Sequence, residues 1–438
     1  MFYRPIKVLL AGLVCVIFSA CSSPQMGFFN KKSPHELYAD RLERAGLKNS
    51  ALGISWLKAA EKALTTPVQI SLPYKETGYF SAETPSAAGY LFDLQRGEFL
   101  KVAVEKTPVT GFYLFIDLWD KTENEPARYL SSADTATLSL QFEVKKSGSY
   151  ILRIQPELLS NGSYTLTMTT GPSLAFPVPA NANPRIASIW GDQRDAGKRK
   201  HEGVDIFAKF RTPAIAAADG YVTSVRTGGL GGKVVFMRPD QKDYVLYYAH
   251  LDSQFAREGQ RVLTGDTLGL IGNTGNARST PPHLHFGIYT NGGAIDPYPF
   301  IRHNSRQLSA VKADTAVLNQ FVRIRSQSPL LQMPESRATS IKTLPRNMMV
   351  RVESAVSDYY RISLPDGSGG FVRDKDIAFS DKPVAGLAAD SVVILYAQPL
   401  KFAAPKAEIN AGAKMQVIGY FGEYKFIKYH DLSGWIKE

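Results

Sequence analysis

Residues 283–288 read His-Leu-His-Phe-Gly-Ile, and residues 201–206 read His-Glu-Gly-Val-Asp-Ile. In an extended strand, successive side chains point to opposite faces of the sheet. In the first stretch apolar residues alternate with the two histidines, so one face is predicted to be buried and the other to carry both imidazoles. In the second stretch His201 and Asp205 are an even number of positions apart and share a face. Two strands are therefore predicted to present histidine and carboxylate groups on a common surface.

Histidine is concentrated around these two stretches. The chain has seven histidines in 438 residues, and four of them lie between residues 201 and 285. A histidine, an aspartate and a second histidine are suitable zinc ligands, and they leave a fourth position open, as in catalytic zinc sites. A lone histidine on a strand is usually solvated or hydrogen-bonded, so the prediction of a metal site depends on both stretches together. Glu202 is not part of a helical H-E-x-x-H signature, and we expect its side chain to be in solvent.

Residues 185–300 resemble the lysostaphin-type, or LytM-like, zinc metallopeptidases, which cut peptidoglycan. The resemblance covers about a quarter of the chain, and its motifs have the order and spacing of the family. The matching motifs lie at residues 201–206, 212–220, 248–251, 272–276 and 282–286. The resemblance implies that His201, Asp205 and His285 bind zinc, and that His250 and His283 line the site without being ligands.

Two positions depart from the family pattern without removing an implied ligand. Pro281 stands where glycine is usual, and Gly287 replaces a common glutamate. Hydrolysis of an amide at neutral pH requires a stronger nucleophile than water, and zinc lowers the pKa of a bound water to about 7. His250 and His283 are the predicted catalytic residues, because a histidine can accept the proton and relay it to the leaving amine. Which of the two is the base and which stabilises the oxyanion is left open.

Composition favours a mostly β, multidomain protein. The chain contains 35 Gly, 26 Pro, 21 Tyr and 23 Phe, which favour sheets and turns over a helical bundle. Its only cysteines are Cys15 and Cys21, so the body of the chain has neither a disulfide framework nor a cysteine zinc site. The net charge of +11 points to a polyanionic partner such as cell wall, nucleic acid or acidic lipid. With the resemblance, we expect the partner to be peptidoglycan and not nucleic acid.

The first 21 residues resemble a bacterial lipoprotein signal. Basic residues precede an apolar run over residues 8–20, which is shorter than the roughly 20 residues of a membrane-spanning helix. Residues 18–21, Phe-Ser-Ala-Cys, resemble a lipobox. We expect residues 1–20 to be a signal peptide and Cys21 to be lipidated, and Ser22 favours delivery to the periplasmic face of the outer membrane. The alternative is a secretory signal with an incidental cysteine.

The chain after the signal divides into one helical and several β-rich segments. Residues 21–65 are predicted to form a lipidated tether followed by a helix that Ser33 caps. Residues 66–171 are predicted to form a β-sandwich that resembles pre-peptidase domains. A proline-rich stretch after it reads as a stiff linker. Residues 185–305 are predicted to be the peptidase domain, built on an antiparallel sheet.

The C-terminal part of the chain contains a weak internal repeat. Each copy begins with an apolar run and ends in a Gly-aromatic-aliphatic triplet, at residues 370–372 and 434–436. The repeat predicts two small five-stranded barrels, residues 317–380 and residues 384–438, that resemble bacterial SH3-like modules. A single β-domain with two similar edges is the alternative.

These predictions combine into one leading hypothesis. We expect a zinc-dependent endopeptidase that hydrolyses peptide cross-links of peptidoglycan in the cell envelope. The alternative is a non-catalytic wall-binding regulator of other peptidoglycan hydrolases, although such relatives typically lack the zinc ligands. A purely structural scaffold is a third interpretation, and it predicts no zinc. Whether the cleaved bond belongs to a diaminopimelate cross-link or to a glycine-rich bridge is left open.

Overall fold

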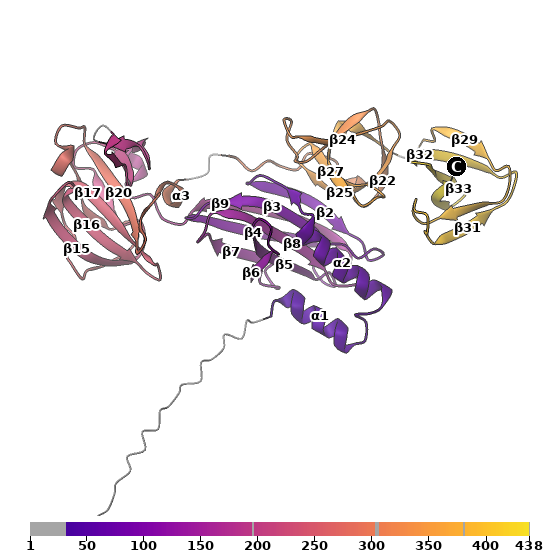
Figure 1. The fold of residues 1–438 in the computed structure, drawn as a ribbon, viewed down its shortest axis with the longest axis horizontal. Helices are drawn as coiled ribbons and strands as arrows, with labels where there is room; N and C mark the ends of the chain where they lie inside the picture. Colours follow the sequence, from indigo (N-terminus) through magenta and orange to yellow (C-terminus); the bar gives the residue numbers. More distant parts are fainter. Residues whose placement is uncertain (1–31, 195–196, 303–305, 380–381, 438) are drawn as a thin grey trace, which may run out of the picture. The chain divides into compact units, whose positions relative to one another are not determined.

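The computed structural model describes residues 32–194, 197–302, 306–379 and 382–437. Strands far outnumber helices in these residues, which confirms the predicted mostly β fold class (Figure 1). None of the described helices is both long enough and apolar enough to cross a membrane. The predicted signal peptide and the lipobox-like run with Cys21 lie outside the described residues.

Two helices precede the first strand, α1 (Pro34–Arg44) and α2 (Ala51–Thr65). The first begins as expected at Ser33, whose Oγ accepts a hydrogen bond from the Glu36 backbone N–H while the Glu36 carboxylate accepts one from the Ser33 N–H. The sequence predicted one continuous helix, but α1 ends next to Gly46, which has a φ of 71°. Glycine adopts this left-handed conformation without the steric cost of a side chain. The predicted helix is therefore a pair of helices.

Two sheets follow the helices and bury one apolar core between them. Their strands are β1 (Val68–Gln69), β2 (Tyr74–Phe80), β3 (Ala88–Leu94), β4 (Glu98–Thr107), β5 (Leu114–Lys121), β6 (Arg128–Ser132), β7 (Ser139–Glu143), β8 (Gly148–Pro156) and β9 (Gly162–Pro172). One sheet has the order β1-β3-β8-β5-β6, and the other contains the order β2-β9-β4-β7. Alternating apolar residues from both sheets fill the core, which is the two-layer arrangement of a β-sandwich.

The segment between residues 172 and 185 packs against the next core and is not a free linker. It contains one short turn of 3-10 helix, η1 (Ala180–Ala182). Leu174 and Val178 are 3% and 1% exposed, and both belong to the core of the following sheet. The Leu174 backbone N–H also donates to the carbonyl of Phe300. The prolines suggested a stiff connection, but the apolar residues between them attach it to the domain that follows.

The next part of the chain is a ten-stranded sheet with a separate hairpin. The sheet strands are β10 (Arg185–Ser188), β13 (Val204–Phe207), β14 (Pro213–Ile215), β15 (Gly220–Gly228), β16 (Gly232–Pro239), β17 (Tyr244–Gln254), β18 (Arg261–Val262), β19 (Thr267–Ile271), β20 (His283–Thr290) and β21 (Gly293–Ile295). The hairpin is β11 (Gln193–Arg194) with β12 (Arg199–Lys200), and the short helices are η3 (Gly275–Ala277) and α3 (Tyr298–Ile301). The main order is β10-β13-β20-β17-β16-β15-β18, and each described pair is antiparallel, as predicted.

The C-terminal repeat is present as two sets of strands with the same order. The first set has η4 (Thr315–Val317), β22 (Phe321–Ile324), β23 (Ser328–Leu331), β24 (Ser340–Leu344), β25 (Met349–Val356), β26 (Tyr359–Ser363), β27 (Gly369–Arg373), η5 (Asp374–Asp376) and β28 (Ile377–Ala378). The second has β29 (Ala385–Ala388), β30 (Val393–Tyr396), β31 (Pro405–Ile409), β32 (Lys414–Phe421), β33 (Tyr424–Tyr429) and β34 (Leu432–Lys437). The orders are β22-β25-β26-β27-β23-β24 and β29-β32-β33-β34-β30-β31. Each copy thus has at least six strands, against the five that the sequence suggested.

The first repeat copy continues the sheet of the sandwich. β2 pairs with β25, where Thr77 lies opposite Ala355 and Gly78 lies opposite Ser354. Phe371 of β27 is fully buried in the core of the sandwich. Sequence patterns do not indicate the pairing of β2 with β25. They show which face of a strand is buried, but not which strand from a distant segment lies beside it.

Candidate metal centre

The register between β13 and β20 builds the candidate site. The two strands are antiparallel, and Asp205 lies directly opposite His285. Their alternate apolar residues are fully buried, as the period-two pattern predicted. His201 differs from expectation, because it lies just before β13, in irregular backbone that bends at Gly203. The predicted shared surface nevertheless forms.

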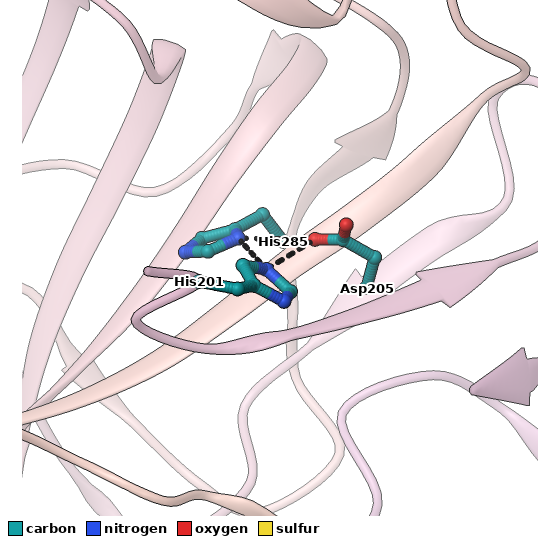
Figure 2. A group of neighbouring side chains, drawn as sticks. All are labelled: His201, Asp205 and His285. Atoms are coloured by element: carbon teal, nitrogen blue, oxygen red, sulfur yellow. Dashed lines mark hydrogen bonds and ion pairs between the residues drawn. The ribbon is translucent and has the colours of Figure 1, made fainter. Parts of the chain in front are cut away.

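Three of the predicted residues converge on one point. Asp205 Oδ1 lies 3.0 Å from His201 Nε2 and 3.0 Å from His285 Nδ1. The two imidazole nitrogens are themselves 3.0 Å apart. Figure 2 shows the three side chains turned toward one another, with the atoms that face each other joined by dashed lines.

Hydrogen bonds behind the cluster determine which nitrogen of His201 faces it. His201 Nδ1 lies 2.9 Å from the carbonyl oxygen of Ile189. Because a carbonyl can only accept, Nδ1 carries the hydrogen, and in the neutral ring Nε2 presents its lone pair to the cluster. This is the tautomer that a metal ligand requires.

The protonation of the other two residues also suits metal binding. Burial disfavours the charged form of Asp205, but its polar contacts with His201 and His285 outweigh burial and hold the pKa of this carboxyl well below its usual range. Burial is the main cause of the lowered pKa of His285. At neutral pH the cluster therefore contains an ionised carboxylate and an uncharged His285 imidazole.

The cluster fits a zinc ion. His201 Nε2 and Asp205 Oδ1 are both hydrogen-bond acceptors, and they lie 3.0 Å apart. A hydrogen on His285 Nδ1 does not lie between them, so these two acceptors face each other without a hydrogen. A cation among the three atoms satisfies all of them at once. Two imidazole nitrogens and one carboxylate oxygen form a catalytic zinc set with one open position.

The other two predicted histidines lie beside the cluster. The His250 and His283 rings are 5.0 Å apart. His250 Nδ1 lies 2.9 Å from the carbonyl of Thr274, and His283 Nδ1 lies 2.9 Å from the carbonyl of Pro281. Each Nδ1 therefore carries a hydrogen, and each Nε2 is the nitrogen available for chemistry. The unusual Pro281 uses only its backbone oxygen here, which any residue would supply.

His250 is held in a strained backbone position. Its φ is 63°, a region that non-glycine residues seldom occupy. Its backbone N–H donates to the carbonyl of Gly231 in the turn between β15 and β16, over 2.8 Å. A Cβ at Gly231 would lie 1.9 Å from the Tyr247 hydroxyl, so a larger residue there would displace the Tyr247 side chain. Burial, followed by repulsion from His283 and His285, lowers the pKa of His250 to about 4.

All five predicted site residues line one cavity of about 640 Å³. Aromatic side chains, among them Phe236, Tyr247 and Tyr289, line it as well. Glu202 is exposed, as expected. Sequence reasoning missed Arg194, whose Nη2 donates to Asp205 Oδ2 over 2.5 Å. Arg194 belongs to the separate two-stranded hairpin, where no apolar period or motif marks it.

Comparisons with known proteins agree on a family for this part of the chain. Residues 199–297 match the sequence model of Peptidase family M23. The L-Ala–D-Glu endopeptidase of Bacillus subtilis is 36% identical over 140 residues, which are 29% of this chain and 43% of that protein. The peptidoglycan DD-endopeptidase ShyC of Vibrio cholerae is 32% identical over 147 residues, which are 34% of this chain and 32% of that protein.

Solved structures include the catalytic domain of the antimicrobial peptidase lysostaphin from Staphylococcus simulans. The matched region is 28% identical and covers 27% of this chain and 92% of the lysostaphin domain, with a TM-score of 0.25. The chain spans less than half the length of the two curated relatives named above. Within this chain, residues 199–297 belong to peptidase family M23.

Proposed function

We propose that this protein is a zinc-dependent endopeptidase that hydrolyses peptide cross-links of peptidoglycan in the cell envelope. The observation that carries the proposal is the convergence of His201 Nε2, Asp205 Oδ1 and His285 Nδ1 within 4.8 Å of one another. Two further imidazoles lie beside this cluster in the same cavity. The names of the relatives, which include an L-Ala–D-Glu endopeptidase and a peptidoglycan DD-endopeptidase, support the same class of substrate.

The chain's own residues divide the work of amide hydrolysis. His201, Asp205 and His285 would hold zinc, which when bound supplies a Lewis acid for the scissile carbonyl and lowers the pKa of a water to about 7. His250 and His283 each present Nε2 to the cavity, because each Nδ1 donates to a backbone carbonyl. One of them takes the proton of the attacking water and delivers it to the leaving amine, and the other stabilises the oxyanion.

Two measurements on the full-length protein test this function. Metal analysis is expected to find one zinc per chain. Digestion of defined cross-linked muropeptides, followed by mass spectrometry, is expected to show hydrolysis of one peptide bond and to identify it. A protein that binds zinc but cuts no muropeptide would refute the enzymatic role and leave the regulator alternative. A protein without zinc would refute both the metal site and the catalytic role.

We further propose an envelope location and a wall-binding role for the C-terminal repeat. The run at residues 18–21 supports lipidation of Cys21 and anchoring on the periplasmic face of the outer membrane. A single acyl chain binds a membrane only marginally, whereas the several acyl chains of a bacterial lipoprotein would hold the protein there firmly. The two repeat copies, proposed as SH3-like modules, would bind the wall. Fractionation of wild type and Cys21→Ala, with mass spectrometry of the mature N-terminus, tests the anchor. An unmodified, freely soluble wild-type protein would refute it.

A further inference from the structure

We propose that Arg194 is a positioning residue of the metal centre, which holds Oδ2 of Asp205 so that this carboxylate binds a metal through Oδ1 alone. Arg194 Nη2 lies 2.5 Å from Asp205 Oδ2. The other oxygen, Oδ1, lies 3.0 Å from His201 and 3.0 Å from His285. The two oxygens of one carboxylate therefore face different partners. This inference rests on the proposed zinc enzyme and adds to it a residue outside the ligand set.

The assignment of the two Asp205 oxygens to different partners affects how many atoms this residue could offer to a metal. A carboxylate with two free oxygens can bind a metal through both of them, whereas a catalytic zinc site needs an open position for water or substrate. A guanidinium is a strong partner for the second oxygen, because it is always charged and its hydrogen bonds to carboxylates are charge-assisted. Arg194 thus leaves Asp205 one oxygen for the metal and keeps the open position available.

Arg194 also reaches the outer side of a second ligand. Its Nη2 donates to Ser188 Oγ over 2.7 Å, and this oxygen lies 3.1 Å from His201 Nδ1. The Ser188 hydroxyl donates its hydrogen to Asp192 Oδ2 over 2.8 Å, so its oxygen remains an acceptor for both neighbours. One arginine therefore connects the outer contacts of Asp205 and His201. Such outer contacts fix the orientation of ligands.

The hairpin of β11 and β12 carries this arginine to the site. It is a separate two-stranded sheet, not part of the ten-stranded one, and Arg194 belongs to its first strand. The Arg194 side chain is 35% exposed, whereas the Asp205 side chain is 8% exposed. Substitution of Arg194 therefore removes a contact at the rim and leaves no large apolar cavity in the core.

Zinc affinity tests the proposal directly. We expect Arg194→Gln to weaken zinc binding by about 10- to 100-fold, as measured by competition with a chromophoric chelator. Arg194→Lys keeps a charge but not the forked geometry of the guanidinium, so its zinc affinity is expected to lie between those of wild type and Arg194→Gln. Ser188→Ala should have a smaller effect, because the Ile189 carbonyl still orients His201. Arg261→Gln is the matched control: it removes another Arg–Asp pair, 2.6 Å long and away from the ligands, and should bind zinc like wild type.

A cobalt-substituted protein reports the number of ligands. If Arg194 keeps Oδ2 from the metal, Arg194→Gln should weaken the visible absorption of the cobalt form, because that absorption falls as the coordination number rises. Equal melting temperatures of the metal-free variant and metal-free wild type would show that the fold is intact. If Arg194→Gln had the zinc affinity of wild type and an unchanged cobalt spectrum, the role of Arg194 would be overturned and the proposed function would stand. A wild-type protein that binds no zinc would overturn the proposed function with it.

Discussion

One donor atom from each of His201, Asp205 and His285 lies at the same point, so the loss of any one removes a proposed metal ligand and a polar neighbour of the other two. We expect His201→Ala, Asp205→Ala and His285→Ala to lose zinc and muropeptide cleavage together. Metal content and cleavage rate of the purified variants provide the test. His430→Ala is a control on an exposed histidine. Full zinc occupancy in His285→Ala would show that the ligand assignment is wrong.

His250 and His283 should separate metal binding from turnover. Both rings lie beside the cluster, yet both are oriented by backbone carbonyls and not by the ligands. We expect His250→Ala and His283→Ala to keep zinc and to lose roughly 10²- to 10⁴-fold in turnover, the usual contribution of general acid–base catalysis. Zinc analysis and rates on a soluble cross-linked peptide are measured on the same samples. Near wild-type turnover in either variant would remove that histidine from the mechanism.

Among the structural elements, α1 is attached to the sandwich through a buried histidine. His35 is 5% exposed, its ring stacks on Trp56 with centroids 4.5 Å apart, and its Nε2 lies 2.6 Å from Gln155 Oε1. Burial, followed by the charge of Arg153, lowers the pKa of His35 to about 3. Arg153 is itself paired with Asp117 over 2.5 Å. The docking of this helix therefore requires an uncharged imidazole.

This attachment predicts acid sensitivity. Below about pH 6.5 the unfolded chain takes up a proton at His35, whereas the folded chain does not until about pH 3, so the free energy of unfolding falls as the pH is lowered through this window. At pH 5 the loss is about 2 kcal/mol, from about 1.36 kcal/mol for each pH unit below 6.5. Melting temperatures between pH 7 and pH 5 should fall less steeply in His35→Phe, which keeps a ring against Trp56, than in wild type. The exposed-site variant His430→Phe should follow wild type, and equal slopes in all three proteins would contradict the assignment.

At the scale of the whole molecule, a buried ionic network joins the sandwich to the first repeat copy. Glu76 is fully buried, accepts hydrogen bonds from Tyr74, Tyr90 and Tyr164, and lies 3.5 Å from Arg361 of β26. Removing one partner of a buried charge pair typically costs about 3–5 kcal/mol, because the other charge remains without compensation. The first repeat copy is therefore part of the fold of the sandwich and not an independent appendage.

This union predicts different results for two truncations. Deletion of residues 384–438 leaves the Glu76–Arg361 pair intact, so we expect it to weaken binding to wall sacs more than it slows cleavage of a soluble peptide. Deletion of residues 317–438 removes Arg361 and the β25 pairing, and should also lower the melting temperature. Co-sedimentation with sacs, peptide cleavage and thermal melting are compared for both. Equal losses on sacs and soluble peptide after the shorter deletion would contradict a wall-binding role.

The local features of the site were predictable because each depends on a short range of sequence. Alternating apolar residues determine which face of β13 and of β20 is buried, and hence that His283 and His285 lie on the opposite face. The order of the five motifs indicated the family of this part of the chain, which the match over residues 199–297 bears out. The capped start of α1 at Ser33 was predictable for the same reason, because a capping box spans only four residues.

The sequence by itself thus determined the mostly β fold class, the antiparallel peptidase sheet and the candidate histidines and aspartate. The tertiary structure alone decided that Arg194 reaches Asp205 Oδ2, that backbone carbonyls select the tautomers of His201, His250 and His283, and that β2 pairs with β25. The reason is physical, because the periodicity of a strand depends only on residues that are neighbours in the sequence. The other features depend on where the folded backbone brings distant atoms: a hydrogen bond to a carbonyl, a salt bridge from a separate hairpin and a pairing between distant strands.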